Sequence, residues 1–98
     1  MYFQLNRRLG IRIPHLPKSW EEHSSLEQAR ILHEWENIRG AIPDRIKELE
    51  RQIQSRQSQL DQEEDFLRSC RLNEEISDIA SIINDLWIWF RTTPSVNN

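Results

Sequence analysis

Apolar side chains recur at helical spacing near the C-terminus, in the most apolar stretch of an otherwise polar chain. Steps of three and four residues place one set on a single helix face: Leu72, Ile76, Ile79, Ile83, Leu86 and Phe90. Other large apolar residues fall off that face: Ile82, Trp87, Ile88 and Trp89. A helix that is apolar nearly all round must be covered by its own chain, by a second subunit or by lipid. This need for cover is the strongest indication in the sequence.

A first helix is predicted over residues 25–39. Its buried positions would be Leu26, Ala29, Ile31, Leu32, Trp35 and Ile38. Gly40 is well placed to end it in a left-handed conformation. Two capping boxes precede it, one from Ser19 to Glu22 and one from Ser24 to Glu27. Either a short helical turn comes before the main helix, or only one of the two boxes forms.

A second helix is predicted over residues 44–69, after Pro43 in its first turn. A heptad-like apolar seam follows it: Ile42, Ile46, Leu49, Ile53, Leu60 and Leu67. Arg56 and Glu63 interrupt the seam, which indicates a coiled-coil pairing that is weak in its middle. We expect a turn at 69–73, where Asn73 can cap a third helix over 73–91. The alternatives are a turn near 55–61, or one unbroken helix from 44 to 90.

These elements predict an all-α fold, a small three-helix bundle built on an elongated antiparallel helical hairpin. Residues 1–18 form a basic, extended, non-helical arm, because Gly10, Pro14 and Pro17 oppose a helix there. Residues 19–91 form the helical domain, and 92–98 a disordered tail. The predicted core brings the first two helices against the third: Trp20, Trp35, Ile38, Ile42 and Ile46 against Ile83, Leu86, Trp87 and Phe90.

Charge is distributed unevenly between the arm and the helices. The 98-residue chain has a formal net charge of −3. Its arm contains no acid and four bases, which form a candidate anion-binding set: Arg7, Arg8, Arg12 and Lys18. The arm could bind an anionic partner such as nucleic acid. Alternatively, it folds back onto an acidic helix, which we favour because four charges are a small electrostatic footprint.

Candidate chemistry is sparse. Cys70 is the single cysteine, so no intrachain disulfide can form. No histidine has a glutamate three residues before it, as a carboxylate-bridged helical metal site would require. Two glycines leave little room for a phosphate-binding loop. We therefore expect no enzyme activity, no cofactor and no metal. The apolar runs are too short for a secretory signal or a membrane span, so a cytoplasmic protein is expected.

The sequence therefore predicts a helical protein–protein interaction module, an adaptor or a regulatory or assembly subunit. One hairpin cannot cover the whole C-terminal stretch, so we expect a homo-oligomer, most simply a dimer, or an obligate protein partner. The candidate interface is the last helical turn: Leu86, Trp87, Ile88, Trp89 and Phe90. The alternative is a nucleic-acid-associated factor that binds through the arm, and an enzyme comes third.

Overall fold

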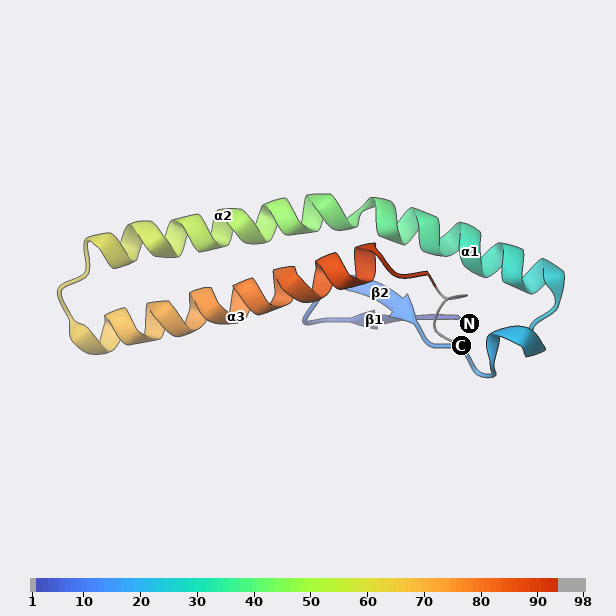
Figure 1. Cartoon of the computed structure of the whole chain (residues 1–98). Helices are drawn as coiled ribbons and strands as arrows, with labels where there is room; N and C mark the ends of the chain where they lie inside the picture. The colour runs from blue at the N-terminus through green and yellow to red at the C-terminus, as the bar shows by residue number, and fades with distance from the viewer. Residues whose placement is uncertain (1, 94–98) are drawn as a thin grey trace.

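The computed structural model describes residues 2–93 and is an elongated molecule of 60 × 20 × 19 Å. Figure 1 shows a short β-hairpin followed by long helices. The elements, in chain order, are β1 (Phe3–Asn6), β2 (Ile11–Pro14), a 3-10 turn (Trp20–Glu22), α1 (Ser25–Gly40), α2 (Ile42–Asp61) and α3 (Phe66–Phe90). The prediction of a mostly helical protein is confirmed.

Helices α1 and α2 form one long bent helix, and Ala41 is the only residue between them (Figure 1). Gly40 does not end α1 in a left-handed conformation, because Gly10 is the only described residue with a positive φ. Ala41 itself keeps right-handed helical angles, with φ −89° and ψ −10°. Pro43 has no N–H to continue the helical hydrogen bonds, which explains a bend here without a reversal of the chain.

The three-helix bundle is therefore not the observed architecture. An antiparallel hairpin of α2 and α3 is present, but α1 continues beyond the end of α3 along the direction of α2 (Figure 1). The β-hairpin packs beside α1 and the C-terminal end of α3, in the place that a third packed helix would have taken. A bend at Ala41 cannot fold α1 back, so another segment has to cover its apolar face.

The turn between α2 and α3 spans residues 62–65, so the predicted turn at 69–73 is wrong. Asp65 caps α3, and its carboxylate Oδ1 accepts the backbone N–H groups of Leu67 at 2.9 Å and Arg68 at 3.3 Å. Asn73 lies inside the helix. Leu67 belongs to the first turn of α3, not to the seam of the second helix, and is 72% exposed.

The predicted extended arm is a two-stranded antiparallel hairpin, in which Leu5 is paired with Arg12 and Asn6 with Ile11. Gly10 closes its turn with a φ of 78°, and its N–H donates to the Asn6 carbonyl at 2.8 Å. A side chain at position 10 would also approach the Arg45 guanidinium to 2.6 Å. The positive φ is what requires glycine here, whereas the Arg45 guanidinium is the end of a flexible side chain and could move aside.

Both predicted capping boxes form, and the alternative with a short turn before the main helix is the correct one. The Ser19 N–H donates to the Glu22 carboxylate at 3.0 Å, and the Ser24 N–H donates to that of Glu27 at 2.9 Å. The 3-10 turn directs the chain from the hairpin into α1. The turn fixes the angle at which the chain enters α1, and this places the apolar side of the β-hairpin against α1.

The core lies at one end of the molecule, where the hairpin, α1, the first half of α2 and the end of α3 meet. Trp35 is fully buried at its centre, stacked on Phe3 with ring centroids 6.2 Å apart. Its indole N–H donates to the Thr92 carbonyl at 2.7 Å, so Thr92 is not part of a disordered tail. Residues 94–98 of the predicted tail lie outside the described residues. The other core residues are Leu9, Ile11, Ile31, Ile38, Ile42, Ile46, Leu49, Ile79 and Leu86.

Candidate interaction surface

The last turn of α3 divides into a buried side and an exposed side. Leu86 is fully buried, and Trp89 packs edge-on against Trp35 with ring centroids 5.8 Å apart. Phe90 lies 5.2 Å beneath the Arg39 guanidinium, in a cation–π contact. These three members of the predicted interface contact their own chain, and Leu86 offers no surface to a partner.

Trp87 and Ile88 are the exposed members of the predicted interface, at 39% and 49% of their surfaces. The Trp87 ring has an edge-on contact with Phe90, with ring centroids 5.6 Å apart, which fixes one side of the indole. The rest of the ring is open to solvent, and Ile88 is the next residue along the helix. Large apolar side chains held in place and adjacent to one another are typical of the anchors of protein interfaces.

A second exposed apolar pair lies at the opposite end of α3, where the helical hairpin turns. Phe66 is 77% exposed and Leu67 is 72% exposed. The sequence pattern did not indicate this pair, because Leu67 fits the spacing of the second helix's apolar seam and the turn was expected at 69–73. Asp65 was the signal that could have located it, since an aspartate before an apolar run can begin a helix.

A continuous exposed strip joins the two apolar pairs along the side of α3 that faces away from α2. Its positions follow the same steps of three and four residues, and each of them is exposed: Phe66, Cys70, Asn73, Ser77, Ala80, Asn84 and Ile88, with Trp87 at its edge. We call this strip the outer face of α3. The exposed side of α2, by contrast, is rich in charge, as at Lys47, Glu48 and Arg51. The outer face of α3 is therefore less charged than the exposed side of α2, and the exposed Glu74 and Asp78 lie to one side of it.

Three of the four cations of the arm lie beside acidic side chains of the helices. Arg8 donates to the Asp85 carboxylate at 2.7 Å and to the Ser81 hydroxyl at 3.1 Å. Arg12 donates to Glu34 at 2.7 Å.

Lys18 is 4.0 Å from the Glu27 carboxylate. Arg7 is exposed and forms no ion pair within residues 2–93. The arm is therefore folded back on acidic helices, and less of its charge is free for nucleic acid. The nucleic-acid interpretation stays a prediction.

Glu27 joins the arm to the start of α1. Its carboxylate accepts the Tyr2 hydroxyl at 3.1 Å and the Ser24 N–H at 2.9 Å. The backbone hydrogen bond from Ser24, followed by the hydroxyl of Tyr2, lowers the pKa of Glu27 below its ordinary value. Burial, followed by the hydrogen bond to Glu27, raises the pKa of Tyr2. His23 is enclosed beside these groups, and its Nδ1 is 3.7 Å from the Glu27 carboxylate.

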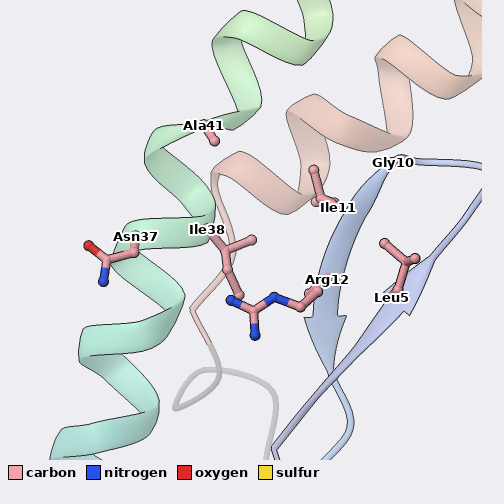
Figure 2. A pocket seen from close by; sticks show the side chains of 7 residues that line it. All are labelled: Leu5, Gly10, Ile11, Arg12, Asn37, Ile38 and Ala41. Atoms are coloured by element: carbon pink, nitrogen blue, oxygen red, sulfur yellow. The ribbon is translucent and has the colours of Figure 1, made fainter.

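An open groove of about 330 Å³ separates the β-hairpin from the bend between α1 and α2. Figure 2 shows Arg12 reaching from β2 toward α1, with Ile11 and Ile38 on facing walls. The lining residues are Leu5, Gly10, Ile11, Arg12, Asn37, Ile38 and Ala41. Its polar side chains are few, and Arg12 is paired with Glu34. The groove thus lacks the set of converging polar groups that orients a small-molecule ligand.

Titratable side chains do not converge on a catalytic or metal-binding arrangement in the described part of the chain. Within residues 2–93, no three histidine, cysteine, aspartate or glutamate side chains are grouped so that they could hold a metal ion. Cys70 is exposed on the outer face of α3, in the half of that helix away from the core. The histidines lie elsewhere, His15 in the arm and His23 and His33 around α1.

Comparison with known proteins gives no relative for this chain. No protein-family model, no curated protein and no solved structure matches it. Of the helices described over residues 2–93, none has both the length and the apolarity needed to cross a lipid bilayer.

Proposed function

We propose that this chain is a non-catalytic protein–protein interaction module, an adaptor or assembly subunit that works in the cytoplasm through the outer face of α3. The observation that carries the proposal is the exposure of Trp87 and Ile88 beside a core that has already buried Leu86. Apolar side chains left outside a completed core are available to a partner. Tryptophan is among the residues that contribute most to binding when a partner covers it.

The shape of the molecule supports the same function. The core occupies one end, and the α2–α3 hairpin projects from it to give an overall length of 60 Å. Few buried apolar residues stabilise the distal half, whose length is therefore not explained by core formation. The outer face of α3 runs along this hairpin with large apolar residues at both ends, which suits an extended contact with another helical surface.

Affinity purification from the native host tests the proposal. The bait is the tagged full chain, compared with a Trp87→Ser, Ile88→Ser double variant. A matched control changes Gln54→Ser and Gln57→Ser, two exposed positions on α2. We expect the wild type and the control to retain the same protein, either an untagged second copy or another chain, and the double variant to lose it. Retention of nothing by the wild type, or equal retention by all three, would overturn the proposal. Melting curves verify that each variant is folded.

A further inference from the structure

The two exposed apolar pairs of α3 lie at opposite ends of the same face. Phe66 is at the first turn, Trp87 and Ile88 are in the last turn, and the strip between them is exposed. Phe66 and Ile88 are roughly 33 Å apart along the helix at 1.5 Å per residue. A surface with an apolar group at each end is self-complementary when two copies lie antiparallel, since each end then faces the opposite end of the other copy.

We propose that the outer face of α3 binds the same face of a second copy of this chain, with the two α3 helices antiparallel and their twofold axis at Ser77. This arrangement rests on the proposed interaction function and specifies its partner. Phe66 of each copy lies against Trp87 and Ile88 of the other. Phe66 at one end of the face, and Trp87 and Ile88 at the other, therefore lose solvent exposure in a single association. Ser77 has a small side chain, which allows the two helix backbones to approach closely at the axis.

Charge favours the antiparallel orientation over the parallel one. Arg91 follows the C-terminal end of α3 and Glu64 precedes its N-terminal end; both are exposed, and neither forms an ion pair within residues 2–93. An antiparallel pair places Arg91 of each copy near Glu64 of the other. A parallel pair would place like charges opposite each other at both ends, which is unfavourable.

The β-hairpin leaves this face open and also removes a charge from its edge. Arg8 bonds to Ser81 and Asp85, so the hairpin turn lies along one side of α3 beside the outer face. Covering an unpaired Asp85 carboxylate would cost desolvation free energy, and the Arg8 guanidinium pairs with it at 2.7 Å. The edge of the outer face near Ile88 therefore carries no unpaired carboxylate from Asp85 where the apolar end of a second copy would bind.

Disulfide cross-linking of the full chain tests both the face and the orientation. In the antiparallel pair, residue 77 of one copy is opposite residue 77 of the other, whereas the two Cys70 side chains are roughly 21 Å apart along the axis. A disulfide requires Cα atoms within about 7 Å. We therefore expect a Cys70→Ser, Ser77→Cys variant to form a linked dimer under mild oxidation, and the wild type to form at least tenfold less.

Two further variants establish the register. Asn84 lies opposite Cys70 of the second copy, so an Asn84→Cys variant that retains Cys70 should give a linked dimer. A Cys70→Ser, Ser58→Cys variant carries its thiol on the exposed side of α2 and should give none. Adding Phe66→Ser to the Cys70→Ser, Ser77→Cys variant should reduce cross-linking at least tenfold. Circular dichroism verifies that these variants are helical.

Each remaining outcome decides against the proposal. Efficient linkage through Cys70 in the wild type would show a parallel or non-specific contact, and equal linkage of the Ser58→Cys control would show random collision. No linkage in the Ser77→Cys variant would show that the faces do not meet. If that variant is not linked but another protein depends on Trp87 and Ile88 in the purification above, the interaction function stands and only the second copy is excluded.

Discussion

The two ends of this molecule are stabilised in different ways. At the core end, Trp35 is enclosed by Phe3, Trp89 and the surrounding aliphatic residues. At the distal end, Leu72 is buried outside the main core, and the Arg56–Glu75 ion pair at 2.8 Å occupies the seam. Hydrophobic burial grows with the number of neighbours that exclude water, whereas a half-exposed ion pair contributes little. The core end therefore provides most of the stability of the fold. The distal end contributes little to stability and is free to present a surface.

Substitution of the two tryptophans should give the largest contrast. Trp35→Ala should lower the free energy of unfolding by about 3–5 kcal/mol, because it leaves a cavity in the core and breaks the hydrogen bond to Thr92. Trp87→Ala should cost about 1 kcal/mol or less in the isolated chain, since much of the ring is exposed. Urea denaturation measures both values. Equal losses would mean that Trp87 belongs to the core.

The distal ion pair should have a smaller effect. Arg56→Ala should lower the free energy of unfolding by about 1 kcal/mol or less, because the Arg56 and Glu75 side chains are 29% and 43% exposed and water screens their attraction. Urea denaturation at low and high salt measures this loss of unfolding free energy, which should become smaller as the salt concentration increases. A loss comparable to that of Trp35→Ala would show that the distal half is as important to folding as the core.

Glu27 should make the attachment of the arm sensitive to acid. Its pKa is lower in the folded chain than its ordinary value of 4.5, so its stabilising effect is complete above 4.5 and is lost as the pH falls through the folded value. Glu27→Gln should therefore lower the melting temperature at pH 7 and cease to do so in strong acid. Thermal melts from pH 7 to pH 2 measure this. A difference in melting temperature between the wild type and Glu27→Gln that stays constant from pH 7 to pH 2 would show that the ionised Glu27 carboxylate does not stabilise the arm.

The cations of the arm should have the smallest effect. Arg8 and Arg12 are engaged with Asp85 and Glu34, so we expect no retardation of a short DNA or RNA duplex in low salt. An electrophoretic mobility assay measures this. If the wild type does bind, with steep salt dependence, and an Arg7→Ala, Arg8→Ala, Arg12→Ala variant does not, the nucleic-acid function replaces the one proposed above.

Local sequence patterns predicted the parts of the fold that depend on local interactions. Helical spacing identified the apolar face of α3, and the capping boxes located the start of α1. The antiparallel α2–α3 pairing also followed from its seam. Trp35, Ile38, Ile42 and Ile46 share the core with Leu86, as expected.

The predictions were wrong where the local structure depends on a contact distant in sequence or on a single side chain. The β-hairpin has strands of only four residues, and its apolar side is stabilised by α1 and α3, which no local pattern reveals. Gly40 can end a helix or continue one, and here the chain continues into α2. The start of α3 depends on the Asp65 cap. The exposed pair at Phe66 and Leu67 followed from that start, so the candidate surface was only half predicted.

The molar mass of the wild-type chain in solution, measured by light scattering across a concentration series, tests the central claim most directly. Self-association through the outer face of α3 predicts that the mass rises with concentration from the 11.9 kDa of one chain toward twice that value, and no further. A Phe66→Ser, Trp87→Ser variant should remain at 11.9 kDa while keeping its helical circular dichroism. A wild type that stays at 11.9 kDa at every concentration would contradict the claim.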